Sequence, residues 1–233
     1  MGHDSREYFL ATARSALADA VRSAPLVTPQ ERAGRLARGA RRGDPAIFMR
    51  ALDGLGVVCE MASTASEARR AVVRALEATD AVQAAVWEHP LLEAVDLEGV
   101  LAERDVEALR PPRRKMANGP VERLCPKLAQ AGIGITAADA ALAESGTLIL
   151  RIGLGRERAV SLLPPVHLAI LAASNLYAGT ADLPPLLESW RVDGLPSAVH
   201  CVTGPSSTGD IEYNLVKGMH GPLAVRVIVL SWL

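Results

Sequence analysis

Short apolar runs alternate with helical stretches along most of this chain. Seven runs lack the polar alternation of a half-exposed strand and are typical of strands covered on both faces of a sheet. They span residues 55–61, 82–87, 132–135, 147–152, 166–172, 198–203 and 223–230. Helical spacing between most of these runs predicts an α/β fold with a mainly parallel sheet.

End signals place the expected helices. Thr64 followed by Glu67 forms a capping box, which predicts a helix that continues to residue 78. Further helices are expected over residues 98–109, 121–130 and 137–144. Thr136 would cap the last of these and Gly146 would end it.

The first fifty residues differ in charge from the rest of the chain. They hold nine Arg against two Glu and three Asp, whereas the whole chain has a net charge of -1. Residues 5–22 have the apolar spacing of an amphipathic helix. We therefore expect an Arg-rich helical N-terminal extension over residues 1–50 and an α/β domain over residues 51–233. The arginines form either a solvated face or a patch that binds phosphates or a membrane.

Composition narrows the classes of function. With 49% hydrophobic and 22% charged residues, the chain is an ordinary folded protein. Its balanced charge and 3% aromatic content argue against a nucleic-acid partner, because phosphate attraction and base stacking both lack their usual side chains. The start has no apolar signal segment, and no later apolar run is long enough to span a membrane. We expect no membrane insertion and a cytoplasmic location.

Local motifs argue against several enzyme classes. Cys59, Cys125 and Cys201 lie more than sixty residues apart, and the histidines show no HExxH spacing, so no metal site is expected. Gly204 and Gly209 have the spacing of a P-loop, but the lysine that would contact the nucleotide phosphates is missing. The GxG pairs also lack the third glycine of a dinucleotide fingerprint.

The first candidate site is the polar turn after the run at 198–203. A helical stripe from Ile211 onward predicts that this turn lies at a helix N-terminus, where unpaired N–H groups bind anions. The candidate ligand-binding residues of the turn are Gly204, Ser206, Ser207, Thr208 and Asp210. Equally, the hydroxyls and Asp210 could only cap that helix.

The second candidate site holds groups suited to proton transfer or nucleophilic attack. Glu144 lies in a turn before an apolar run, with Thr147 as a further candidate ligand-binding residue. Desolvation would make this carboxylate a nucleophile or base, but a solvated helix end is the alternative. His167 could carry a proton or be a hydrogen-bonded core histidine. His220, in a glycine-rich turn, could face the site or only turn the chain.

Three motifs occur in a specific order. They read GITAADAALAESGTLIL, SLLPPVHLAIL and VTGPSSTGDIEYNLVKGMHGP. Through these motifs the chain resembles, from about residue 132 to residue 230, the lactate utilisation protein C family, whose shared unit is the LUD domain. The family's last motif often reads GPSRTADIE, whereas here Ser207 replaces the arginine. If that arginine binds an anion in relatives, this chain has lost or relocated the contact.

The resemblance implies a three-layer α/β/α sandwich, similar to the ribose-phosphate isomerase and CoA-transferase-like superfamily. It also implies a role in the oxidation of L-lactate to pyruvate beside two partners that look like iron–sulfur oxidoreductases. This chain would then be a non-redox component without a cofactor of its own, and the iron–sulfur clusters would lie on the partners. A small carboxylate-bearing ligand would suit such a role.

Two other hypotheses remain open. By analogy with enzymes of the same fold, the chain could act alone on an acyl, CoA or folate-type substrate, with Glu144 as nucleophile or base. It could also be a purely structural interaction module, which would bind no small ligand.

Overall fold

The computed structural model describes Thr12 and residues 40–111, 126–210 and 214–233. The chain separates into two compact units, residues 1–39 and 40–233. Most of the expected N-terminal extension, including the helix over residues 5–22, lies outside the described residues, as does part of the helix expected over 121–130. The rest of this section concerns the second unit.

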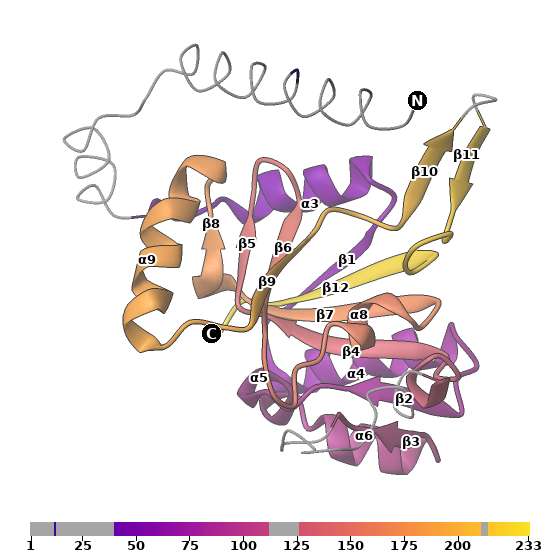
Figure 1. Cartoon of the computed structure of the whole chain (residues 1–233). Coiled ribbons are helices and arrows are strands. Elements are labelled where there is room, and N and C mark those ends of the chain that lie inside the picture. The colour runs from indigo at the N-terminus through magenta and orange to yellow at the C-terminus, as the bar shows by residue number, and fades with distance from the viewer. Residues whose placement is uncertain (1–11, 13–39, 112–125, 211–213) are drawn as a thin grey trace, which may run out of the picture. The chain divides into compact units, whose positions relative to one another are not determined.

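A central sheet of six parallel strands forms the middle of this unit (Figure 1). Its strands, in spatial order, are β1 (Val58–Ala62), β12 (Ala224–Leu230), β7 (Val166–Ala172), β4 (Ile133–Ala138), β2 (Gln83–Val86) and β3 (Glu107–Leu109). Every pairing within this sheet is parallel. The predicted α/β fold with a mainly parallel sheet is therefore confirmed.

Helices cover one face of the central sheet. They are α4 (Ala65–Glu77), α5 (Pro90–Ala94) and α6 (Leu97–Glu103), of which α5 lies at the strand ends. Helix α3 (Pro45–Gly54) packs against β1 and against the turn at Gly146. The predicted capping box begins α4, since the Thr64 side chain accepts the N–H of Glu67 and the Glu67 carboxylate accepts the N–H of Ser63. Arg74 of α4 pairs with Glu60 of β1, which places α4 over the Glu60 face.

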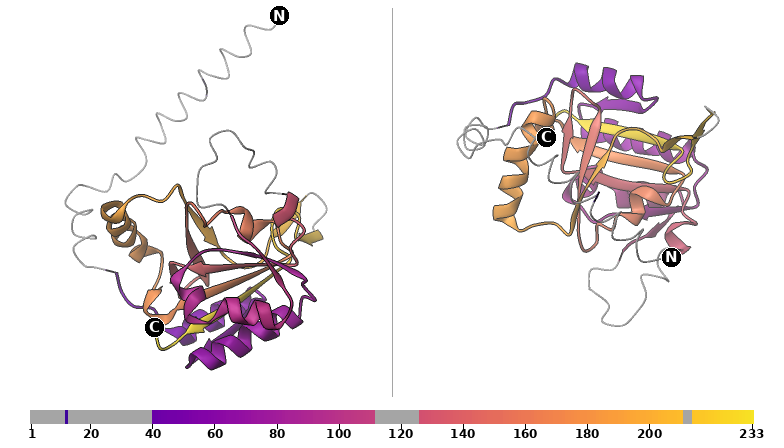
Figure 2. Two further views of the ribbon diagram at one scale, coloured as in Figure 1. Left: turned by 90° about the horizontal axis from the view of Figure 1, so that it is seen from below. Right: turned by 45° about the horizontal axis from the view of Figure 1, so that its top comes forward.

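The opposite face of the sheet is covered by α8 (Ala159–Leu162) and by a smaller sheet. Strand register puts Gly134 on the face opposite to Glu60, and a Cβ on Gly134 would overlap the carbonyl oxygen of Val160 in α8. The absence of a side chain at Gly134 thus lets α8 approach β4 closely. Figure 2 shows helices on one side of the sheet and strands with α8 on the other.

The smaller sheet has four strands in the order β8 (Leu176–Tyr177), β5 (Ala140–Leu142), β6 (Thr147–Ile152) and β9 (Ala198–Val202). Leu148, Leu150 and Val202 point from it into the main core. Its other face, with Ile149, packs on Leu186 and Trp190 of α9 (Leu183–Asp193). Both faces are buried at β5 and β6, whose residues are mainly apolar, whereas most of the edge strand β9 is exposed.

The remaining elements are two single-turn helices, η1 (Ala173–Asn175) and η2 (Thr180–Asp182), and a separate ribbon of β10 (Ser207–Asp210) and β11 (Asn214–Lys217). The two strands of this ribbon pair only with each other and project from the body (Figure 1). None of the helices in the described part of the chain is both long enough and apolar enough to cross a membrane.

Three helix predictions were wrong. Residues 137–144 form the end of β4 and all of β5, and Thr136 is a fully buried strand residue rather than a cap. The alanines there have helical propensity, but burial between two sheets decides their conformation. The helix expected over 98–109 ends at Glu103, and β3 follows. The helix expected after Ser206 is replaced by the β10–β11 ribbon.

Candidate functional site

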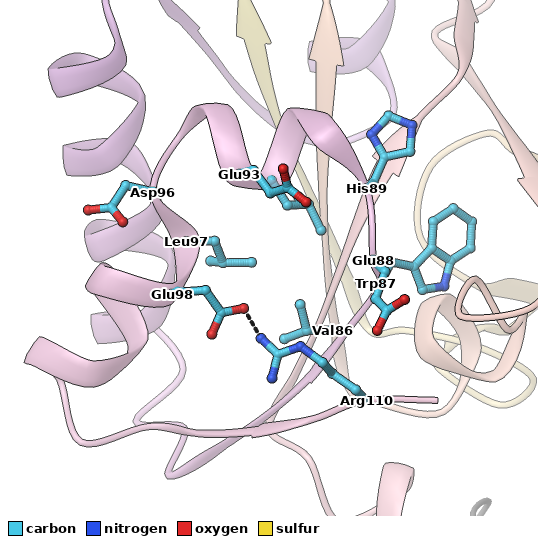
Figure 3. A pocket seen from close by; sticks show the side chains of 10 residues that line it. Val86, Trp87, Glu88, His89, Glu93, Asp96, Leu97, Glu98 and Arg110 are labelled. Carbon is cyan, nitrogen blue, oxygen red and sulfur yellow. Dashed lines mark hydrogen bonds and ion pairs between the residues drawn. The ribbon is translucent and has the colours of Figure 1, made fainter. Parts of the chain in front are cut away.

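A pocket of about 290 Å³ lies beside the carboxyl ends of β2 and β3 (Figure 3). The chain leaves β2 toward β3 at one edge of the sheet and leaves β4 toward β7 in the other direction. The gap between β2 and β4 is therefore a topological switch point, where open α/β sheets commonly bind ligands. The apolar part of the pocket lining includes Val86, Leu92 and Leu97.

The charges around this pocket are mainly negative. Four carboxylates line it, those of Glu88, Glu93, Asp96 and Glu98. Arg110, the one arginine in the lining, forms an ion pair with Glu98. A carboxylate ligand would be repelled here, because like charges raise each other's energy in a partly desolvated site.

An imidazole and a carboxylate meet next to the pocket. The Nδ1 of His89 accepts the N–H of Leu91 at 3.1 Å, so its Nε2 carries the proton of the neutral ring. That Nε2 lies 3.9 Å from the Asp139 carboxylate, which also accepts the N–H of Arg151 and pairs with Arg156 at 3.1 Å. The sequence analysis did not single out His89 and Asp139. The signal that could have found them is the presence of polar residues shortly after β2 and β4.

His167 lies at the centre of the molecule, on the face of β7 that looks toward α8. It is 0% exposed, and its Nε2 lies 2.8 Å from the hydroxyl of Thr136. Burial, together with the smaller effect of the charge of His200, lowers the pKa of His167 to about 3. The ring is therefore neutral at physiological pH, and its Nδ1 is buried without a hydrogen-bond partner.

His200 of β9 lies between the smaller sheet and α8. Its Nδ1 is 3.3 Å from the hydroxyl of Ser161, which donates its own proton to the carbonyl of Arg158 at 3.0 Å. Burial lowers the pKa of His200, and the positive charge of Arg158 acts in the same direction. His200, Ser161 and Arg158 were not among the sequence candidates, although Ser161 is the first residue of the SLLPPVHLAIL motif that contains His167 and Arg158 lies three residues before it.

Three hydroxyls form a chain at the start of β6. Thr147, which is 7% exposed, bonds to Ser145 at 2.7 Å and to Thr203 at 2.8 Å. Gly204 follows with a φ of +75°, and a Cβ there would press on Leu55. The hydroxyl of Thr147 thus joins β6 to the loop after β9.

The polar turn at 204–210 leads into a strand, so its residues are not at a helix N-terminus. The N–H of Ser206 donates to the carbonyl of Pro222, and its hydroxyl accepts the N–H of His220 at 3.3 Å. Ser207, Thr208 and Asp210 belong to β10, where the Ser207 hydroxyl donates to Pro205. The helix-dipole argument for an anion at this turn is therefore wrong, because it required a helix.

Glu144 accepts two hydrogen bonds from Thr180, from the N–H at 3.1 Å and from the hydroxyl at 3.0 Å. Its carboxylate also lies against Gly179, where a Cβ would overlap it. This exposed carboxylate holds the turn that begins η2.

One segment joins most of the sequence candidates. Within residues 200–206, His200 lies beside His167, Thr203 bonds to Thr147, and Ser206 bonds to His220. Glu144 stands apart, because it binds Thr180. Among the described residues no group of three or more His, Cys, Asp or Glu could hold a metal ion.

Comparison with known proteins shows which family this chain matches. A family model described as the LUD domain matches residues 46–230. The chain belongs to the LUD domain family. It is 37% identical over 164 residues to a protein named lactate utilization protein C from Halalkalibacterium halodurans, covering 70% of this chain and 68% of that protein. A protein of the same name from Geobacillus sp. is 41% identical over 104 residues, 44% of this chain and 43% of that protein.

A solved structure shares the fold of this LUD domain. It is the crystal structure of a DUF162 family protein from Deinococcus radiodurans, with a TM-score of 0.55 and 19% identity. The match covers 86% of this chain and 98% of that one. The similarity to the ribose-phosphate isomerase and CoA-transferase-like superfamily stays a prediction.

Proposed function

We propose that this LUD domain protein takes part in lactate utilisation as a non-redox component of a cytoplasmic system that oxidises L-lactate to pyruvate. The observation that carries the proposal is the family membership over residues 46–230, together with relatives named lactate utilization protein C. A fold alone does not establish chemistry, so the specific relatives and not the α/β architecture support the assignment.

The electron carriers of the system lie on partner subunits in this proposal. Those partners are iron–sulfur oxidoreductases, as the family resemblance implies, and this chain has no cofactor of its own. The widely separated Cys59, Cys125 and Cys201 agree with this division, since clusters are held by closely grouped thiolates. The contribution of this chain is to bind a small carboxylate-bearing molecule or to position a partner.

Deletion of the gene tests the role in the living cell. In a host strain that lacks other lactate dehydrogenases, the deletion strain should fail to grow on L-lactate and should grow normally on pyruvate. A plasmid copy of the gene should restore growth on lactate. Equal growth of the parent and deletion strains on L-lactate would overturn the proposal.

A reconstituted assay tests whether the iron–sulfur partners need this chain for lactate oxidation. The chain is purified with its iron–sulfur partners, and lactate-dependent reduction of an electron acceptor is followed with and without it. We expect the complete set to reduce the acceptor and the set without this chain to be inactive. Full activity of the partners alone would contradict the proposed role.

A further inference from the structure

Arg158, Ser161 and His200 lie at the edge of a buried polar cluster, where the Ser161 hydroxyl links the His200 ring to the Arg158 carbonyl. Arg158 immediately precedes α8, Ser161 lies within it, and His200 comes from β9 on the other side. The Arg158 side chain is exposed and His200 is half-buried, so this edge is open to solvent. His167 lies behind it with no solvent access at all.

The charges that shift the pKa values of the two histidines in this cluster are both positive. The pKa of His200 is lowered by its burial and by the positive charge of Arg158, and that of His167 by its burial and by the charge of His200. Among the described residues, no carboxylate offsets either effect. Around His200, α8 contributes Arg158 and Ser161, β7 contributes His167, and the facing residue of β6 is Leu150. A negative charge here would remove an electrostatic penalty.

The buried ring of His167 provides a second, independent observation. Its Nδ1 has no hydrogen-bond partner although it is fully enclosed, and an unsatisfied buried polar atom destabilises the folded state. Such unsatisfied groups are uncommon, and a functional site is one of the recognised reasons for them. The pocket of Figure 3, in contrast, is lined by four carboxylates.

We propose that Arg158, Ser161 and His200, backed by His167, bind the carboxylate of a small organic acid. The guanidinium of Arg158 pairs with the carboxylate, and protonated His200 donates a second, charge-assisted hydrogen bond. The identity of the acid as L-lactate or pyruvate rests on the proposed function, whereas the preference for a carboxylate rests on the side chains.

Binding is coupled to proton uptake by His200. In the free protein its pKa is below the ordinary value of 6.5, and a bound carboxylate raises it. The acid itself stays ionised above about pH 5, since carboxyl groups titrate near pH 4. Affinity therefore increases as the pH falls through the raised pKa of the bound state and levels off below the pKa of the free protein, by at most about tenfold per pH unit because one proton is involved.

Isothermal titration of the full chain with pyruvate, L-lactate, acetate and inorganic phosphate tests the site. We expect the carboxylates to bind and Arg158→Gln and His200→Gln to weaken that binding by about tenfold or more. Arg70→Gln on α4, on the opposite face of the sheet, is the matched control and should bind like wild type. His200→Gln should also remove the pH dependence.

Spectra of the wild-type imidazole nitrogens give a readout that needs no variant. Pyruvate should shift the His200 ring signals and raise the pH at which they titrate. Binding of phosphate alone, no binding, or equal affinities in all variants would overturn the site. Loss of growth on lactate without carboxylate binding would overturn the site alone, and binding at the site without a growth defect would overturn the proposed function alone.

Discussion

At the residue scale, the most informative side chain is His167, because it is ionisable and yet enclosed. The sequence left two roles open for it, a proton carrier or a core histidine. The structure shows a neutral ring whose Nε2 is bonded to Thr136. With a pKa of about 3, this ring does not exchange protons in the neutral range.

This burial predicts acid sensitivity. The folded pKa of His167 is lowered from 6.5 to about 3, so the unfolded chain binds the proton first. Stability is therefore lost as the pH falls below about 6.5, and this residue alone accounts for about 2 kcal/mol at pH 5. Chemical denaturation at about pH 7, 6 and 5 measures the effect. His167→Gln should lose less stability over that range than wild type, and parallel curves would contradict the assignment.

Variants of Glu144 distinguish a structural role of its carboxylate from a catalytic role. Gln at this position keeps an oxygen that can accept from Thr180, whereas Ala removes both hydrogen bonds. We expect Glu144→Gln to change the unfolding free energy by less than about 0.5 kcal/mol and Glu144→Ala to reduce it by about 1–2 kcal/mol. Thermal unfolding compares the two variants. If Glu144→Gln abolished turnover of an acyl or CoA substrate while remaining folded, Glu144 would be catalytic.

At the element scale, the contact between α8 and β4 covers the face of the sheet that carries the buried His167. Gly134→Ala should reduce the unfolding free energy by about 1–3 kcal/mol or more, because the new methyl group would overlap the carbonyl oxygen of Val160. Gly153→Ala is the control, since nothing lies within 4 Å of the added carbon. Denaturant titration of both variants checks this, and equal stabilities would show that α8 can move away without cost.

Within the smaller sheet, β5 and β8 are the strands that sequence patterns failed to predict. Residues 137–144 are rich in alanine, and alanine favours helices in isolation. Their strand conformation depends on pairing with other strands, since β5 pairs with the adjacent β6 and with β8, which is distant in sequence. By contrast, β6 and β7 were predicted with the bounds that the structure shows, because their apolar runs are rich in β-branched and bulky residues.

At the scale of the whole molecule, an ion pair joins the beginning of the described body to a turn far along the chain. Asp182 is nearly buried and accepts hydrogen bonds from the N–H and the guanidinium of Arg41 and from the N–H of Gly179. Burial raises the pKa of Asp182, but these hydrogen bonds outweigh it and lower the pKa overall. The pair secures residues 40–44 to the smaller sheet.

Asp182→Asn should therefore reduce the unfolding free energy by about 2 kcal/mol at neutral pH, because it removes a charged acceptor from partly buried donors. The wild type gains this stability above the unfolded pKa of 3.8 and loses it as the pH falls through the lower folded pKa. The two proteins should converge in strong acid. Arg191→Gln, on an exposed pair with Glu188, is the control and should cost less than about 1 kcal/mol.

The sequence by itself determined the α/β class, the central strands other than β3, the capping of α4 and the family, because these depend on local periodicity and on short ordered motifs. Tertiary structure alone decided that 137–144 is a strand, that the turn at Ser206 opens a ribbon, and that His167 meets Thr136 and His200. The contact of His167 with Thr136 joins residues 31 positions apart. No local pattern encodes such contacts, since they arise only when two sheets and α8 bury their apolar faces against one another.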